Sequence, residues 1–225
     1  MKNFLARLFG KKNDMNIDIT IIGTGNMGRA LATRSIAAGK SLQVLARSTE
    51  TAATFAADLG TGITSGSTAE VPAGRIVVLA LPFDAAKEYV AAQGSALDSK
   101  ILVDITNPVD FATFDSLTTA AGSSAAQEIS ALTSATVVKA FNTTFAGPLT
   151  SGSADGKPLD VFVAGEESAR GEVAAFVTAA GMRPLEVGGL HHARELEGFQ
   201  LLIMAMQVNP ALPDFNWGTA LTVVG

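Results

Sequence analysis

Apolar residues are grouped along the chain in short continuous runs, which alternate with longer segments of helix-forming residues. The runs predict strands at 17–22, 41–46, 75–80, 100–105, 136–141, 159–164 and 182–187, and 61–70 has room for one short strand. The segments between them predict a helix that ends at Gly39, and further helices at 50–59, 83–92, 123–132, 166–180 and 193–207. Strands that are apolar throughout and alternate with helices are typical of parallel sheets, which helices cover on both faces. The pattern therefore predicts an α/β fold with a doubly wound, mainly parallel sheet of the Rossmann type.

The remaining segments give the chain its expected organisation. Residues 109–122 look irregular, 150–157 read as a surface loop, and 208–225 read as a mostly irregular tail. Pro184 interrupts the last strand, which we therefore place at an edge of the sheet. We expect a lead-in segment at 1–14, a nucleotide-binding domain at 15–188 and a small C-terminal helical region at 189–225.

The lead-in segment places Phe4, Leu5, Leu8 and Phe9 on one face of a short helix, with basic residues around it. Such a helix suits a membrane surface, or packs on the protein body or a neighbouring subunit, and we favour packing. Arg7 interrupts what would be the apolar part of a signal peptide. No apolar run approaches the roughly 20 residues that span a bilayer, so we expect a cytoplasmic protein without a transmembrane segment.

Composition excludes several classes of function. The net charge of −5 supplies no basic footprint for nucleic acid, and the chain has no cysteine for thiol catalysis or thiolate metal sites. The only histidines are the neighbours His191 and His192, so we expect no multi-histidine metal site. A content of 48% hydrophobic residues is enough for a sizeable core in 225 residues.

The most informative stretch is the glycine turn between the first strand and the first helix. Gly23, Thr24, Gly25, Asn26, Met27 and Gly28 match the G-x-G-x-x-G pattern, in the strand–turn–helix context that gives the pattern its meaning. The first glycine permits a tight turn, the second lets backbone approach a pyrophosphate, and the third lets the helix pack close to the strand. The turn therefore predicts a dinucleotide whose pyrophosphate lies on the helix N-terminus. An ordinary glycine turn is the alternative.

The second strand indicates which nucleotide is bound. NAD-binding proteins carry an acidic residue here, but this chain has Ala46, Arg47, Ser48 and Thr49. Arg47 offers a planar set of donors suited to phosphate oxygens, and Ser48 and Thr49 add hydroxyl groups. We therefore predict NADP(H) rather than NAD(H), the alternative being that Arg47 is only a solvated surface residue.

The loops after the later strands should lie at the same rim of the sheet. Leu81 and Pro82 follow one strand, Asn107 and Pro108 the next, and Asn142 and Thr143 the one after. We expect these loops near a nicotinamide ring, although Asn and Pro are also common turn residues. No acid–base pair stands out, and we predict no catalytic side chain and no metal ligand. Direct hydride transfer between two bound rings needs positioning more than proton transfer.

Two further pairs of polar residues have structural rather than functional interpretations. Asp104 and Lys139 lie within or near the ends of apolar strands, where we expect satisfied buried polar groups rather than catalysis. His191 and His192 begin the last helix, and we expect them to cap it and to pack.

Taken together, these motifs resemble the coenzyme F-420-dependent NADP oxidoreductases. The resemblance rests on five stretches in the same order, which are IIGTGNMGRALA from Ile21, ALPFDA from Ala80, LVDITNP from Leu102, VVKAFNT from Val137 and ARELEGFQ from Arg194. It implies a Rossmann domain with a small C-terminal domain, NADP(H) at the glycine turn, and a deazaflavin stacked on the nicotinamide. It also implies a homodimer.

Residue by residue, the resemblance places Thr24, Asn26, Met27 and Arg47 at NADP-binding positions. It places Leu81, Pro82, Ala140 and Asn142 near the nicotinamide. The family often has Ser-Arg after the second strand, whereas here Ala46 precedes Arg47 and Ser48 supplies the hydroxyl. The positions that contact the deazaflavin are less clearly marked, so the small-molecule redox partner is F-420, a flavin such as FMN or FAD, or another acceptor.

Two rival interpretations remain. Pyrroline-5-carboxylate reductases share the glycine turn, but they add a substantial helical domain, and the segment after Gly189 is short for one. A non-catalytic NADP-binding sensor would need the same nucleotide site and no further catalytic residues.

Overall fold

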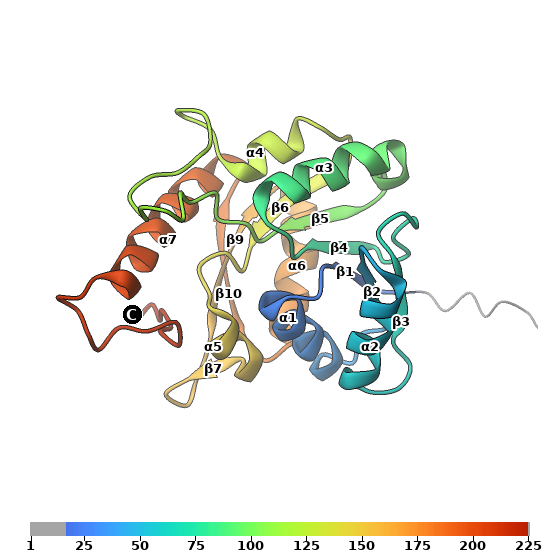
Figure 1. Ribbon diagram of the computed structural model, residues 1–225, viewed down its shortest axis with the longest axis horizontal. Coiled ribbons are helices and arrows are strands. Elements are labelled where there is room, and N and C mark those ends of the chain that lie inside the picture. Colours follow the sequence, from blue (N-terminus) through green and yellow to red (C-terminus); the bar gives the residue numbers. More distant parts are fainter. Residues whose placement is uncertain (1–16, 225) are drawn as a thin grey trace, which may run out of the picture.

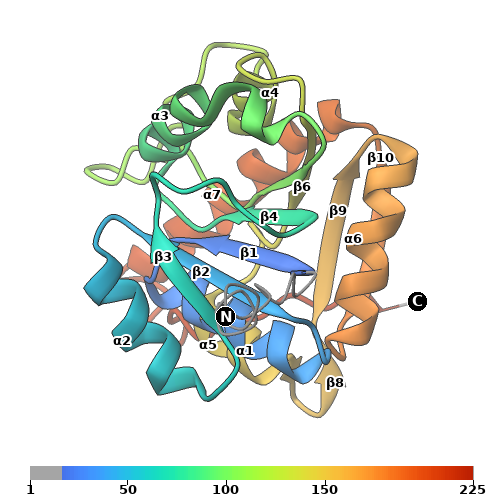
Figure 2. The same ribbon diagram turned by 90° about the vertical axis from the view of Figure 1, so that its right-hand side faces the viewer.

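One eight-stranded sheet organises the computed structural model, which describes residues 17–224. The predicted lead-in segment lies outside the described residues. The strands follow the order β10-β9-β6-β5-β4-β1-β2-β3 across the sheet (Figure 1 and Figure 2). Their bounds are β1 (Ile19–Ile22), β2 (Leu42–Ala46), β3 (Thr64–Ser67), β4 (Ile76–Leu79), β5 (Ile101–Asp104), β6 (Thr136–Ala140), β9 (Asp160–Gly165) and β10 (Arg183–Gly188). β1 to β6 are parallel, so the predicted α/β Rossmann-type fold with a mainly parallel sheet is confirmed.

Helices cover both faces of this sheet. They are α1 (Asn26–Ala37), α2 (Thr49–Leu59), α3 (Phe83–Gln93), α4 (Ala125–Ser130), α5 (Ala146–Ser151), α6 (Glu167–Ala179) and α7 (Ala193–Val208), with 3₁₀ turns at Gly94–Leu97 and Leu190–His192. Figure 2 shows α3 and α4 on one side of the sheet and α1, α2 and α5 on the other. Because successive strand residues point to opposite faces, Ile21 packs in one core with Leu31 of α1, and Ile22 packs in the other with Tyr89 of α3. Among residues 17–224, no helix has the length and apolar character needed to cross a bilayer.

β9 departs from the parallel pattern, because it runs antiparallel to β6. A parallel strand would need a crossover that carries the chain back along the whole sheet. Here the connection instead forms α5, which packs against α1, and the chain returns directly beside β6. β10 pairs with β9 alone, so the prediction that the strand containing Pro184 lies at an edge is confirmed.

The prediction of an irregular surface loop at 150–157 is wrong in detail. It contains the end of α5 and a small hairpin of β7 (Ser153–Ala154) and β8 (Lys157–Pro158). Asp155 and Gly156 form its two-residue turn, with φ of 49° and 73°. Asp-Gly is a strong hairpin signal because both turn positions need positive φ, so the sequence carried the information.

Candidate functional site

The glycine turn lies where the order of strands reverses, between β1 and β4. Open parallel sheets bind ligands at such a point, beyond the carboxyl ends of the strands. Gly23 has φ of 110°, and a Cβ at this position would collide with the carbonyl oxygen of Ala80. A Cβ on Gly28 would collide with the carbonyl oxygen of Gly23. These two glycines therefore allow the tight turn and the close approach of α1 to the strand, as predicted.

The middle glycine faces open space instead. No atom lies within 4 Å of a Cβ built on Gly25, which is exposed and occupies the N-cap position of α1. No side chain caps this helix, and its first turn has no acidic residue. The first amide groups of α1 are therefore available to an anion, and the helix dipole favours negative charge there.

A cavity of about 710 Å³ opens directly above this turn, and we call it the first cavity. Its walls come from the glycine turn, from the loop after β4 and from the loop after β5. The predicted residues Gly25, Asn26, Met27, Gly28, Leu81, Pro82 and Asn107 line it. Thr106 also lines it, and the buried hydroxyl oxygen of this residue has no hydrogen-bond partner among the described residues.

A second cavity, of about 580 Å³, adjoins the first and shares six lining residues with it, which are Asn26, Met27, Ile105, Asn107, Phe111 and Met204. Its other walls come from the segment 142–147, from Gln200 of α7 and from the C-terminal tail, and include Phe145 and Trp217. None of the described residues that line it carries an ionisable side chain. The second cavity is therefore neutral and rich in aromatic and sulfur-containing side chains.

A strained turn places Asn142 in the wall of the second cavity. The preceding residue, Phe141, has φ of 63°, a region that bulky side chains rarely adopt, and its carbonyl accepts hydrogen bonds from Thr144. The Asn142 amide nitrogen donates to Asn107 Oδ1 at 3.0 Å and to the Leu196 carbonyl at 3.2 Å. These donations fix the amide and leave Asn142 Oδ1 buried without a partner among residues 17–224.

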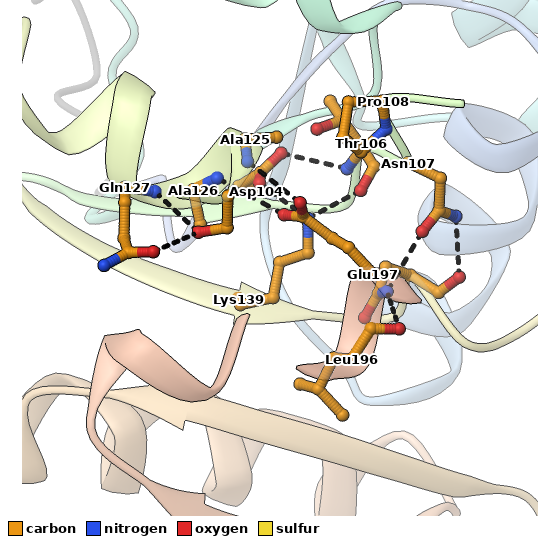
Figure 3. A network of polar contacts seen from close by, with 12 residues as sticks. Asp104, Thr106, Asn107, Pro108, Ala125, Ala126, Gln127, Lys139, Leu196 and Glu197 are labelled. Carbon is orange, nitrogen blue, oxygen red and sulfur yellow. Dashed lines mark hydrogen bonds and ion pairs between the residues drawn. The ribbon is translucent and has the colours of Figure 1, made fainter. Parts of the chain in front are cut away.

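A buried ionic cluster joins β5, β6 and α7 beside the segments that line the cavities (Figure 3). Lys139 Nζ lies 2.8 Å from Asp104 Oδ2, 2.7 Å from Glu197 Oε1 and 2.6 Å from the Thr106 carbonyl. All three ionisable side chains are fully buried. Asp104 and Lys139 are thus satisfied buried groups, as predicted, and their partner Glu197 joins α7 to the ends of β5 and β6.

Glu197 also accepts hydrogen bonds from the backbone of α4. The Ala125 and Ala126 amides donate to its carboxylate at 2.9 and 3.4 Å. Burial raises the pKa of the Glu197 carboxyl, and the Lys139 charge and the donated hydrogen bonds oppose that rise. Sequence reasoning missed this residue, although buried positions at 193, 196, 197, 200 and 204 form a regular inward stripe on α7.

Other predicted site residues lie elsewhere. Arg47 and Ser48 are exposed at the end of β2 and line neither cavity, and the Ser48 hydroxyl caps α2 by accepting from the Thr51 amide at 3.3 Å. Thr24 lines a smaller hollow of about 350 Å³ beside α2. Ala140 is fully buried in the sheet and lines neither cavity.

The histidines match the packing prediction only in part. His192 occupies the N-cap position of α7, but its side chain makes no capping hydrogen bond. Its ring instead packs on His191, with 4.1 Å between the centroids, and its Nδ1 lies 3.5 Å from the Glu195 carboxylate. Neither histidine lines the first or the second cavity.

The tail after α7 is irregular, as predicted, but it is docked on the body of the protein. Trp217 packs edge-to-face on Phe145, with 5.3 Å between the ring centroids. Further along, the Val223 amide donates to Asp160 Oδ2 at 2.6 Å, and Arg183 pairs with the same carboxylate. Arg183 lowers the pKa of Asp160 through this hydrogen bond. The tail thereby supplies one wall of the second cavity.

The sequence is similar to one known protein family and to one curated relative. Residues 18–108 match the family model described as "NADP oxidoreductase coenzyme F420-dependent". Metalloreductase STEAP3 of Rattus norvegicus is 29% identical over 195 residues, which make up 86% of this chain and 38% of that protein. The chain therefore spans well under half the length of this curated relative.

Two solved structures share the fold of this chain. A candidate F420-dependent NADP reductase from Arthrobacter sp. FB24 is 25% identical, with a TM-score of 0.77 over 91% of this chain and 100% of that chain. The hypothetical protein SMa0349 of Sinorhizobium meliloti is 27% identical, with a TM-score of 0.69 over 77% of this chain and 86% of that chain. The resemblance predicted from the sequence motifs is thus confirmed, because residues 18–108 match the model of the coenzyme F420-dependent NADP oxidoreductases and the fold matches a candidate reductase of that type.

Proposed function

We propose that this protein is an oxidoreductase that transfers a hydride between NADP(H) and a deazaflavin such as F-420, or a flavin such as FMN or FAD. The observation that carries the proposal is the pair of adjoining cavities that meet at the start of α1. One is walled by an uncapped helix N-terminus, and the other is neutral and aromatic. A dinucleotide suits the first cavity and a planar ring suits the second.

The nucleotide would be held mainly by backbone. In the proposed arrangement the diphosphate lies on the amides at Gly25 and Asn26, while Gly23 and Gly28 keep the turn tight and Thr24 and Met27 flank it. Arg47 and Ser48, exposed after β2, would receive the 2′-phosphate that distinguishes NADP from NAD. Leu81 and Pro82 would pack against the nucleotide from the loop after β4.

The nicotinamide would lie where the two cavities meet. Asn107 lines both cavities, and Asn142 Oδ1 is a buried acceptor that needs a donor. The carboxamide group of nicotinamide carries such an N–H donor, so these residues fit the ring at this place. Ala140 would contribute only by supporting this loop from the sheet.

When bound, NADPH would supply the hydride, and the acceptor would take up that hydride and one proton from solvent, to give NADP⁺ and the dihydro form of the acceptor. The residues of this chain orient the two rings and exclude water from the space between them. No side chain that lines the second cavity needs to ionise for this reaction, which depends on positioning.

Anaerobic mixing tests the proposal. The protein is mixed with NADPH and, in separate samples, with F-420, FMN, ferric citrate or a cyclic imine, and the nicotinamide absorbance is followed. Ferric citrate is included because the curated relative is a metalloreductase. We expect oxidation with F-420 or FMN. Tight NADPH binding without oxidation by any acceptor would favour the sensor interpretation, and oxidation only by an imine would favour the pyrroline-5-carboxylate reductase interpretation.

The homodimer and the cytoplasmic location stay predictions. The exposed apolar side chains of Phe199 and Leu202 on α7 offer a surface for the dimer contact, and sedimentation would show whether the protein is dimeric.

A further inference from the structure

Gln200 is a buried residue of the second cavity that the proposed function leaves without a role. We propose that its amide recognises the imide edge of the acceptor ring, the N–H and adjacent carbonyl of a pyrimidine-dione, and so selects flavin-like and deazaflavin-like acceptors. This inference rests on the proposed function, because it assigns a specificity-determining residue to the acceptor site.

The position of Gln200 carries the first step of the argument. It lies on the inward stripe of α7, between Glu197 and Met204, and its side chain is 1% exposed. Gln200 Oε1 has no hydrogen-bond partner among the described residues, although the side chain lines the second cavity. A buried acceptor without a donor is unfavourable, so an N–H group of a ligand that reaches it would be bound more tightly.

The chemistry of a primary amide gives the second step. Its oxygen accepts a hydrogen bond, and the neighbouring nitrogen donates one in the same plane. An imide presents the complementary pair, an N–H beside a carbonyl oxygen, so one Gln side chain can bind it through two parallel hydrogen bonds. A carboxylate ligand would not satisfy Oε1, because an ionised carboxylate offers no donor.

The other walls of the second cavity suit the rest of such a ring. Met27, Met204, Phe145 and Trp217 provide apolar and aromatic surfaces, and no ionisable group lies among the lining residues. These side chains would contact a flat heterocycle without discriminating between heterocycles. Gln200 is therefore the side chain of α7 that can form hydrogen bonds with the imide edge of the heterocycle.

The fold also holds this amide in place. Glu197, one turn before Gln200, is ion-paired with Lys139, and the Leu196 carbonyl accepts a hydrogen bond from Asn142. α7 is thus fixed to β6 and to the loop after it at the turn that precedes Gln200. Recognition by a fixed side chain costs little ordering entropy when the ligand binds.

The test compares two probes and three proteins. Lumiflavin carries the imide N–H, and 3-methyllumiflavin replaces that hydrogen with a methyl group. Each probe is titrated with wild type, Gln200→Leu and Gln93→Leu, all saturated with NADP⁺, and quenching of flavin fluorescence gives the Kd. Gln93 lies at the end of α3, where its amide donates to the Thr68 carbonyl, and it lines neither cavity. Thermal melting confirms that both variants are folded.

We expect wild type and Gln93→Leu to bind lumiflavin about tenfold more tightly than 3-methyllumiflavin. Gln200→Leu should bind lumiflavin about tenfold more weakly than wild type and should no longer distinguish the two probes. Equal Kd values for the two probes on wild type, or an equal loss for both on Gln200→Leu, would overturn the role of Gln200 while NADP⁺ binding stands. Lumiflavin that does not bind the NADP⁺-loaded wild type would also overturn it. Absence of NADP⁺ binding would instead remove the proposed function itself.

Discussion

The two cavities are built in different ways. One end of the first cavity is formed by backbone of the glycine turn and the start of α1, and its other walls come from the loops after β4 and β5, the start of α3 and Met204 of α7. The second is shaped by side chains from the segment 105–111, the segment 142–147, α7 and the tail. A backbone-built site tolerates changes of side chain except at glycine, whereas a side-chain-built site depends on the packing that brings distant segments together. Single substitutions should therefore affect the two cavities differently, in nucleotide affinity or in the free energy of unfolding.

The buried ionic cluster should show the largest effect. Lys139→Met leaves Glu197 and Asp104 buried without their cation, and we expect a loss of about 3–5 kcal/mol in the free energy of unfolding. Urea denaturation measures it. Because burial raises the pKa of Glu197, protonation favours the folded variant, so the deficit should shrink as pH falls and grow as pH rises.

A matched variant sharpens this result. The triple variant combines Lys139→Met with Asp104→Asn and Glu197→Gln. It removes both buried carboxylates together with the cation, so most of the stability lost in Lys139→Met should return. If Lys139→Met alone has the stability of wild type at neutral pH, then the cluster does not hold α7 as we describe.

Gly25→Val tests the first cavity with little effect on the fold. A Cβ at this position meets no atom within 4 Å, so the free energy of unfolding should fall by no more than about 1 kcal/mol, the cost of valine at a helix N-cap, while the side chain would fill the space of the diphosphate. We expect NADPH affinity to fall by at least about 100-fold, or about 3 kcal/mol, measured by calorimetry. Gly28→Val is the contrast, because its Cβ would collide with the Gly23 carbonyl and the protein itself should be destabilised. Retained NADPH binding in Gly25→Val would show that the nucleotide lies elsewhere.

Arg47→Ala should separate the two nicotinamide nucleotides. The guanidinium is exposed at the end of β2, where we place the 2′-phosphate, and its removal should weaken NADPH binding about tenfold and NADH binding hardly at all. Parallel titrations with both nucleotides measure the ratio. Equal losses for NADPH and NADH would remove Arg47 from the 2′-phosphate site.

The smallest effect should be the loosening of the C-terminal tail at acid pH. Asp160 has a lowered pKa, so its stabilising contacts with Arg183 and Val223 are present above its unfolded pKa, about 3.9, and are lost as pH falls below it. Because Arg183 is largely exposed, we expect an effect below about 1 kcal/mol. Acrylamide quenching of Trp217, the only tryptophan, reports tail docking.

Asp160→Asn provides the reference for that titration. Its tail should be looser at neutral pH and should show no further loosening in the same acid range. If quenching of Trp217 changes with pH in the same way in wild type and in Asp160→Asn, then another group anchors the tail.

The same contrast explains what the sequence could reveal. Strands, helices and the glycine turn follow from local periodicity and from backbone requirements, so β1, α1 and their role were predictable. Only packing brings three other residues to the site, Glu197, Gln200 and Trp217. The partners of these residues lie far away in the sequence, as Lys139 does from Glu197, and no local pattern marks them. The antiparallel β9 was missed for a related reason, because its apolar run reads the same in either direction.

The most direct test of the account is the structure of a crystal of this protein soaked with NADP⁺. We predict density for the diphosphate on the backbone amides of Gly25 and Asn26, for the 2′-phosphate beside Arg47, and for the nicotinamide next to Asn107 and Asn142. A nucleotide bound away from the start of α1, or no nucleotide at a concentration that saturates the protein in solution, would contradict it.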